Sequence, residues 1–268
     1  MKSTNHIDLR NVQAVYSGRE GDLWELLMGQ QIHIGGFQSS MGLADEAKIE
    51  AGMHGVDLAC GSGGGIRFLL RYRGVEFMVG VDATEKMIHY ARERCQKEGL
   101  SKKAEFLLKD VCDTGLSSGS VDFVWGEDAW CYVEDKAILI SEAARLVKPG
   151  GKIAFTDWIE GATEMTEDEA ERYLLFMKFP NILNLQEYVE LLTRNGCRIY
   201  RAEDTGRFAP YIDLYLDMIS MQLTSDALRI INFDMDLLQA MAGEMKFMQH
   251  LAQEGKIAQG IFVAQKPA

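Results

Sequence analysis

The stretch VDLACGSGGG at residues 56–65 decides the fold, because a short apolar segment carrying one acid runs directly into a glycine-rich turn. A turn that leaves a buried parallel strand uses backbone angles that a Cβ disfavours, and it lets a ligand approach the main chain closely. Gly61, Gly63 and Gly64 supply that freedom. The apolar spacing that begins at Ile66 predicts a helix whose N-terminus points at the ligand. The stretch therefore predicts a loop that binds a nucleotide cofactor.

Two features of this loop distinguish between cofactor classes. A dinucleotide fingerprint counted from Gly61 requires glycine at position 66, where this chain has Ile66. Asp57 lies inside the strand before the loop, where a carboxylate can accept hydrogen bonds from an ammonium group and is poorly suited to a pyrophosphate. We therefore expect a cofactor that carries a positive charge. A glycine turn without a ligand is the alternative for the isolated motif.

Composition restricts the classes of partner. The 268 residues are 47% hydrophobic and 25% charged, enough for a full core, and their net charge is −12. That acidity argues against nucleic acid and anionic membrane partners and suits a small-molecule substrate. The five cysteines are widely spaced and the five histidines show no ligand spacing, so we expect reduced thiols and no metal. With no apolar run near the roughly 20 residues of a membrane span and no signal-peptide core, a cytoplasmic location is expected. Formation of a homo-oligomer stays open.

Two further acids end predicted strands at the same edge of the sheet. Residues 74–82 read as the second parallel strand and end at Asp82, about 20 residues after the loop, where a carboxylate can bind the hydroxyls of an adenosine ribose. Residues 104–112 contain the third strand, after which Asp110 and the Val111 amide can bind the two polar sides of adenine. A helix cap at Asp82 and a surface turn at Asp110 are the alternatives. Together with the glycine loop, these positions define one crevice.

Residues 57–63, Asp-Leu-Ala-Cys-Gly-Ser-Gly, resemble motif I of the class I S-adenosylmethionine-dependent methyltransferases, written Asp/Glu-x-Gly-x-Gly-x-Gly. Ala59 departs from the first glycine, and because alanine disfavours positive φ we expect a slightly altered turn. The resemblance implies S-adenosyl-L-methionine as the cofactor. It assigns cofactor binding to Asp57, Ala59, Gly61, Gly63, Asp82, Ala83, Met87, Asp110, Val111 and Glu127.

Residues 121–125 read as the fourth strand. The loop that follows it, residues 126–132, is expected to carry the residues that act on the substrate. Glu127-Asp-Ala-Trp-Cys-Tyr, followed by Asp135-Lys136, resembles the Gln/Arg-Asp-x-x-x-His-x-x-Asp-Lys loop of the small-amine N-methyltransferases. Asp128 matches the family acid, and Tyr132 stands where the family has histidine. Asp128 or Glu127 could accept the proton of an amine.

Aromatic residues could form a cage around such an amine and stabilise its ammonium form by cation–π contact. The candidates are Trp130, Tyr132, Tyr16 and Trp158. Packing in the core is the alternative for each ring. If the substrate carries a carboxylate, an arginine from the cap is needed, and Arg172 and Arg207 are the two candidates.

The segment before the glycine loop contains a tyrosine, a helix and the sequence Gly-x-x-Ile-His-x-Gly at residues 29–35. This order resembles the N-terminal lid of the sarcosine/dimethylglycine and phosphoethanolamine N-methyltransferases. The resemblance implies that Tyr16 lies over the active site and that His33 contacts substrate, whereas a capped loop histidine is the alternative. A lid fits the chemistry because it excludes water from a reactive sulfonium.

Strand order and resemblance together predict an α/β fold, a doubly wound, mostly parallel seven-stranded sheet of the Rossmann-like class I methyltransferase type with a helical cap. We expect one methyltransferase domain over residues 1–268. Its parts are an N-terminal helical lid at 1–50, a Rossmann-like core at 51–205, a helical cap insertion at 206–255 and the last strand at 256–268.

The expected reaction is in-line methyl transfer from S-adenosyl-L-methionine to the nitrogen of a small amine or amino acid resembling glycine, sarcosine or dimethylglycine. Two alternatives remain open at this point. One is O- or C-methylation of a small natural product. The other is a catalytically silent S-adenosylmethionine-binding sensor, with a nicotinamide dehydrogenase as a weaker candidate.

Overall fold

The computed structural model describes residues 2–4 and 6–268. Its main sheet has the strand order β4-β3-β2-β5-β6-β9-β8, in which β9 runs antiparallel to β6 and β8 and the other neighbours are parallel. The strands are β2 His54–Leu58, β3 Phe77–Asp82, β4 Ala104–Leu108, β5 Val121–Glu127, β6 Val147–Glu160, β8 Arg198–Asp204 and β9 Ile257–Gln265. The expected α/β fold with a doubly wound, mostly parallel sheet is confirmed.

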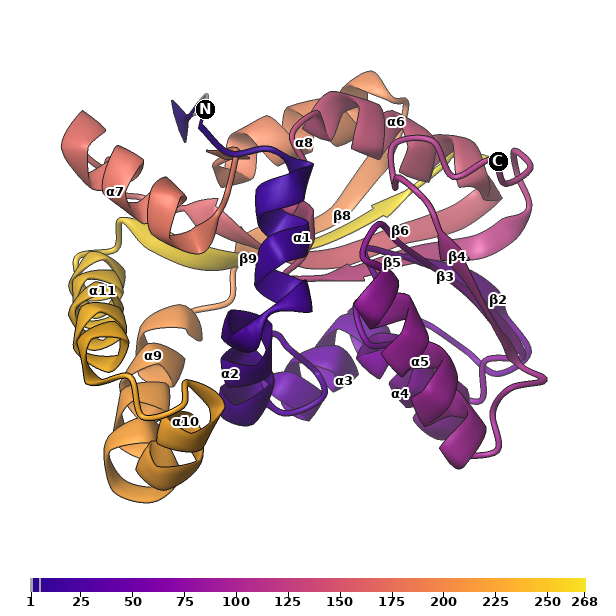
Figure 1. Cartoon of the computed structure of the whole chain (residues 1–268). Helices are drawn as coiled ribbons and strands as arrows, with labels where there is room; N and C mark the ends of the chain where they lie inside the picture. Colours follow the sequence, from indigo (N-terminus) through magenta and orange to yellow (C-terminus); the bar gives the residue numbers. More distant parts are fainter. Residues whose placement is uncertain (1, 5) are drawn as a thin grey trace.

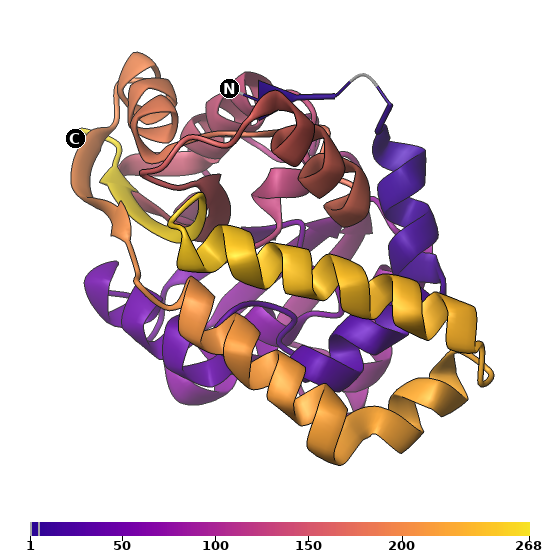
Figure 2. The same ribbon diagram turned by 90° about the vertical axis from the view of Figure 1, so that its left-hand side faces the viewer.

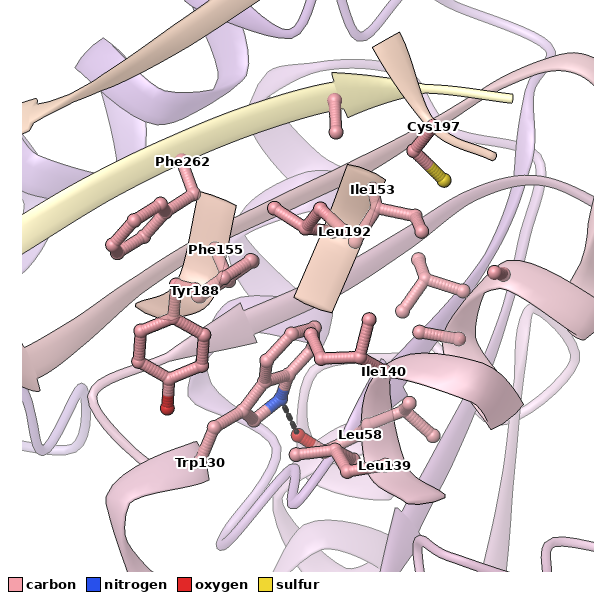
Figure 3. Packing of buried hydrophobic residues seen from close by; sticks show 14 of the residues in the cluster. Leu58, Trp130, Leu139, Ile140, Ile153, Phe155, Tyr188, Leu192, Cys197 and Phe262 are labelled. Carbon is pink, nitrogen blue, oxygen red and sulfur yellow. Dashed lines mark hydrogen bonds between the residues drawn. The ribbon is translucent and has the colours of Figure 1, made fainter. Parts of the chain in front are cut away.

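Helices cover both faces of this sheet (Figure 1). One face carries α3 Gly36–Glu46, α4 Gly64–Tyr72 and α5 Glu85–Lys97, and the other carries α6 Lys136–Leu146 and α8 Leu185–Arg194. Local chemistry sets where these helices begin: Asn184 caps α8 by accepting a hydrogen bond of 2.9 Å from the Glu187 amide. Fully buried aromatic rings, including Phe155 and Phe262, fill the α6 and α8 side (Figure 3).

A second group of helices gathers at one end of the sheet. It consists of α7 Glu167–Met177, α9 Phe208–Met218, α10 Thr224–Ile230 and α11 Met235–Gln253, with a π-helical turn, Ile219–Leu223, between α9 and α10. Helices α9 and α11 lie side by side (Figure 2). The N-terminal helices α1 Leu9–Ser17 and α2 Arg19–Met28 connect the two groups, because α1 contacts α5 and α2 contacts α10.

A small antiparallel sheet joins β1 Lys2–Ser3 to β7 Asn181–Ile182, with Ser3 opposite Asn181. Its strands have two residues each, too short to show a hydrophobic alternation, so sequence patterns did not predict them. This pairing attaches the N-terminal segment to the chain that follows α7. Over the described part of the chain, no helix has the length and apolar character needed to cross a membrane.

The order of the strands places the site. The chain adds β3 and β4 on one side of β2, then returns to lay β5 on the other side, with Asp57 opposite Trp125. A parallel sheet opens into a crevice at the carboxyl ends of its strands where the order reverses. The glycine loop after β2 and the loop after β5 therefore face the same crevice.

Candidate active site

The glycine loop keeps the backbone that its motif requires. Gly61 and Gly63 have φ of +50° and +76°, and Ala59 has φ of +65°. The expectation of an altered turn at Ala59 is therefore wrong. The amides of Ala59 and Cys60 both donate to the Val81 carbonyl, at 2.8 and 3.1 Å, and this tertiary bonding holds alanine in a left-handed conformation.

Asp82 fixes the loop from the end of β3. Its carboxylate accepts hydrogen bonds from the amides of Gly61 at 2.9 Å and Thr84 at 2.8 Å, so it joins the ends of β2 and β3. Burial raises the pKa of this carboxyl, and the two amides oppose the shift.

Asp57 and Glu127 form the inner acidic wall. Gly65 passes so close to both that a Cβ there would lie 3.0 Å from Glu127 Oε2 and 3.2 Å from Asp57 Oδ2. Burial, together with the neighbouring charges of Glu127 and Asp82, raises the pKa of Asp57 well above its usual range. Among the described residues, no hydrogen-bond donor reaches the Asp57 carboxylate. A buried carboxylate of this kind fits a cationic ligand, which agrees with the charge of S-adenosylmethionine.

His33 lies against Glu127 rather than in an open loop. Its Nε2 is 3.3 Å from Glu127 Oε1 and 3.2 Å from Ser40 Oγ, and Ser40 also donates to Glu127 Oε1 at 2.8 Å. The second oxygen of Glu127 accepts from Trp125 Nε1 at 3.0 Å. The segment before α3 is thus bound to the end of β5 through buried polar groups.

Asp128, the residue after Glu127, binds the same segment at Ile34, the residue after His33. Its carboxylate accepts from the Ile34 amide at 2.8 Å and from Gln259 Nε2 at 2.9 and 2.8 Å. Gln259 also donates to the Ile34 carbonyl at 3.1 Å, so one amide side chain joins β9, the β5 loop and the N-terminal segment. Asp128 has φ of +50°, a strained conformation for a non-glycine residue.

Tyr16 and Tyr132 meet across the cavity. The Tyr16 hydroxyl donates to the Tyr132 hydroxyl at 2.9 Å, and the rings pack edge to face with centroids 5.4 Å apart. Burial raises the pKa of both phenols, so neither acts as a base near neutral pH. Both side chains line the cavity.

Two aromatic residues expected in the cage lie elsewhere. Trp130 is fully buried, stacks on Phe155 with centroids 4.1 Å apart and donates from its indole to the Leu58 carbonyl at 3.1 Å (Figure 3). Trp158 packs edge to face on Phe179 and Phe208. Neither side chain lines the cavity. The expectation that these two residues surround an amine is wrong, because both rings pack against other aromatic residues in the core.

The far end of the cavity is formed by residues expected near adenine. Ala83, Met87, Asp110 and Val111 all line it. Asp110 Oδ1 accepts from the Cys112 amide at 2.8 Å, which shapes the turn after β4. Gln13 of α1 donates to the Ala83 carbonyl at 2.7 Å, so the N-terminal helix closes over this end.

These residues enclose a cavity of about 1050 Å³ at the carboxyl ends of β2 and β5. Its described lining contains nine carboxylates, on Asp57, Asp82, Asp110, Glu127, Asp128, Glu134, Asp135, Glu187 and Glu190. Its lysine and arginine are Lys136, which is bonded to Asn181, and Arg194, which pairs with Glu190 at 3.3 Å. The cavity is therefore strongly acidic.

The two candidate arginines for a carboxylate substrate do not line this cavity. Arg172 pairs with Glu244 at 3.0 and 3.1 Å and lies over the Phe247 ring. Arg207 donates to Ser39 Oγ at 3.0 Å. Each guanidinium is bound by groups outside the site.

Sequence patterns missed Gln13, Ser40 and Gln259, which bind site residues far from them in the chain. Their partners Ala83, Glu127 and Asp128 lie 70, 87 and 131 residues away. No local motif marks a single amide or hydroxyl as a long-range partner. An alternating strand such as β9 predicts only that its residues face inward.

Residues 56–155 match the family model described as a methyltransferase domain. This match places a methyltransferase domain at residues 56–155, and the sheet order agrees with the class I S-adenosylmethionine-dependent methyltransferase fold.

Sequence relatives carry different reactions in their names. Phosphoethanolamine N-methyltransferase 1 of Arabidopsis thaliana is 25% identical over 201 residues, which cover 74% of this chain and 40% of that protein. The chain thus spans less than half of that relative. The chloroplastic tocopherol O-methyltransferase of Arabidopsis thaliana is 24% identical and covers 97% of this chain and 83% of that protein.

Solved structures share the fold. A protein described as a sarcosine dimethylglycine methyltransferase from Galdieria sulphuraria aligns with a TM-score of 0.83 at 18% identity, covering 93% of this chain and 97% of that one. Phosphoethanolamine N-methyltransferase 2 of Haemonchus contortus, in complex with S-adenosyl-L-methionine, aligns with a TM-score of 0.85 at 22% identity over 98% of this chain and 61% of that one. The resemblance to these two methyltransferase groups is confirmed.

Proposed function

We propose that the protein transfers a methyl group from S-adenosyl-L-methionine to the nitrogen of a small amine that carries no phosphate or carboxylate. The acidic wall formed by the nine carboxylates of the cavity lining, together with Tyr16 and Tyr132 in the same lining, is the observation that carries this proposal. An ammonium group is attracted by such a wall, whereas an anionic substituent would find no unpaired arginine among the described lining residues.

The cofactor assignment follows from the same residues. We assign the ribose hydroxyls to Asp82, the adenine to Asp110 and Val111 with Ala83 and Met87 beside it, and the methionine ammonium to Asp57. Gly61, Gly63 and Ala59 let the backbone approach the ligand. Bound S-adenosylmethionine supplies a methyl group on a positively charged sulfur.

The protein's own residues then orient the amine and remove its proton. Tyr16 and Tyr132 present two rings and two hydroxyls to the acceptor and stay protonated because of their raised pKa. Asp128 is occupied by Ile34 and Gln259, so we assign it to holding the N-terminal segment closed. We assign acceptance of the amine's proton to His33, which lines the cavity and has its Nε2 3.3 Å from Glu127 Oε1.

A second candidate is O-methylation of a small neutral acceptor. The similarity to a tocopherol O-methyltransferase over 97% of this chain favours it, and a cavity whose described lining offers no unpaired arginine accommodates a neutral alcohol or phenol as well. A histidine base would serve a phenol equally.

The experiment is a turnover assay on matched acceptors. We would confirm binding of S-adenosylhomocysteine by calorimetry and then measure its release from S-adenosylmethionine with ethanolamine against phosphoethanolamine, methylamine against glycine, and a phenol. We expect the uncharged-tail amines to exceed their anionic partners by at least roughly tenfold in kcat/KM. Preference for phosphoethanolamine or glycine contradicts the acceptor proposal, and turnover of the phenol alone selects O-methylation.

A further inference from the structure

Two buried ionisable side chains lie directly behind the loop that carries Tyr132. Lys136, at the start of α6, is 4% exposed, and Asp157, in β6, is fully buried. Neither side chain belongs to the roles assigned above. Buried ionisable groups are costly to desolvate, and apolar residues of equal volume often give the same or greater stability. Their placement therefore calls for an explanation other than stability.

Both side chains bind the backbone of the same residue, Cys131. Asp157 Oδ1 accepts from the Cys131 amide at 3.0 Å, while Lys136 Nζ donates to the Cys131 carbonyl at 3.3 Å and to the Val133 carbonyl at 2.9 Å. The second Asp157 oxygen accepts from the Tyr188 hydroxyl at 2.5 Å, which fixes the carboxylate in turn. Tyr132 lies between the two residues whose carbonyls Lys136 holds, so its backbone has little freedom.

Lys136 also reaches the chain that anchors the N-terminal segment. Its ammonium donates to Asn181 Oδ1 at 2.5 Å and to the Asn181 carbonyl at 3.3 Å. Asn181 is the register partner of Ser3 in the β1–β7 sheet, and its side chain donates to the Glu134 carbonyl at 2.8 Å. One ammonium thus holds the loop of Tyr132 and the strand that binds the start of the segment leading to Tyr16.

We propose that Lys136 and Asp157 are positioning residues that clamp the backbone on both sides of Cys131 and so set the contact between the Tyr132 and Tyr16 hydroxyls. The clamp works by fixing donors and acceptors of the backbone on both sides of one residue, which a pair of apolar side chains cannot do. It touches neither acceptor nor cofactor. The proposal rests on the proposed function in one respect, namely that Tyr16 and Tyr132 form the part of the cavity that binds the methyl acceptor.

The decisive readout is amide hydrogen exchange of the S-adenosylhomocysteine-bound protein, because it does not depend on turnover. In Lys136→Met and in Asp157→Asn we expect exchange in segment 130–136 to be at least roughly tenfold faster, while segment 57–64 of the glycine loop stays within about twofold of the wild type. The affinity for S-adenosylhomocysteine, measured by calorimetry, should change by less than about threefold.

A matched control is Glu142→Gln. Glu142 is a buried acid on the same helix α6, pairs with Arg145 at 2.6 Å, and does not touch the loop. We expect it to lower the Tm without changing exchange in segment 130–136. If a single charge left alone prevents folding, the double variant Lys136→Met/Asp157→Asn removes both charges and should show the same loop-specific exchange.

The clamp is wrong if the folded variants, double variant included, keep wild-type exchange in segment 130–136, or if all segments accelerate together as they would for a purely structural pair. Failure of the proposed function would show differently, as wild-type protein that binds S-adenosylhomocysteine but turns over no amine. With an active acceptor, we also expect the clamp variants to raise the acceptor KM or lower kcat at unchanged cofactor affinity.

Discussion

The cofactor half and the acceptor half of this cavity are built in different ways. The cofactor half uses backbone from neighbouring strands: Asp82 holds Gly61 and Thr84, and Val81 holds Ala59 and Cys60. The acceptor half uses single side chains from distant parts of the chain, such as Tyr16 on Tyr132 and Gln259 on Asp128. A backbone framework tolerates change in side chains, whereas an assembly of single contacts can be retuned residue by residue. We therefore expect variants in the two halves to separate cofactor affinity from turnover.

The largest effect is expected at Asp82. In Asp82→Ala two loop amides lose their acceptor and the ribose loses its partner, so cofactor affinity should fall by at least about 100-fold. Calorimetry with S-adenosylhomocysteine measures it. Asp113→Ala is the control, since this exposed acid follows the neighbouring strand β4 without lining the cavity. If the affinity of Asp82→Ala stays within about threefold of the wild-type value, the assignment of Asp82 to the ribose is wrong.

A smaller effect in the other half is expected at Asp128. Asp128→Asn puts an amide group against the donors of Ile34 and Gln259, which should loosen the N-terminal segment and lower turnover by roughly 30-fold. Cofactor affinity should stay within about threefold. Asp122→Asn is a matched control, because Asp122 lies on β5, the strand that leads to Asp128, and likewise accepts from a backbone amide, that of His54, at 2.8 Å. If Asp128→Asn lowers turnover and cofactor affinity by the same factor, the two halves of the cavity do not act separately.

The tyrosine pair gives a finer test of the acceptor half. Tyr132→Phe keeps the ring and removes one hydroxyl, and we expect kcat/KM for the acceptor to fall by about tenfold. If the two hydroxyls act through their mutual bond, Tyr16→Phe should cost a similar factor and the double variant little more. Tyr200→Phe, on an exposed tyrosine bound to Gln265, should have no effect. Fully additive losses would show that each hydroxyl acts alone.

The smallest predicted effect concerns pH. Burial, helped by the charge of Asp128, raises the pKa of Asp157 to about 7, and the hydrogen bond from Tyr188, the charge of Lys136 and the Cys131 amide oppose that shift. The folded protein therefore holds a proton that the unfolded chain has lost, and this stabilisation disappears as the pH rises through 7. Relative to Asp157→Asn, wild type should lose about 1 kcal/mol of unfolding free energy between pH 6 and 8. The Tm values of both proteins at pH 6, 7 and 8 measure this loss. If the difference in Tm between wild type and Asp157→Asn is the same at all three pH values, Asp157 does not titrate in this range.

The same contrast explains what sequence could predict. The glycine loop, Asp57 and Asp82 lie in local patterns whose strand and turn chemistry fixes their neighbours. Residues 56–111 therefore predicted the first three strands of the sheet and most of the cofactor crevice, and the later strands followed from their own patterns and from the resemblance. Trp130 could not be placed, because an aromatic residue after a strand looks the same whether it enters the core or the cavity. Ala59 was misjudged because tertiary hydrogen bonds override the intrinsic preference of alanine. Asp128 was found as a candidate, but its partner Gln259 carries no signal of its own.

Gln259 lies on β9, 131 residues after Asp128, and this separation sets an order in time. During synthesis, the strands and loops of the cofactor half are complete once residue 127 has emerged. The contact that closes the N-terminal segment cannot form until the chain has grown past residue 259. Such long-range contacts form late and slowly. The nascent protein should therefore acquire its cofactor crevice well before it acquires a closed reaction chamber.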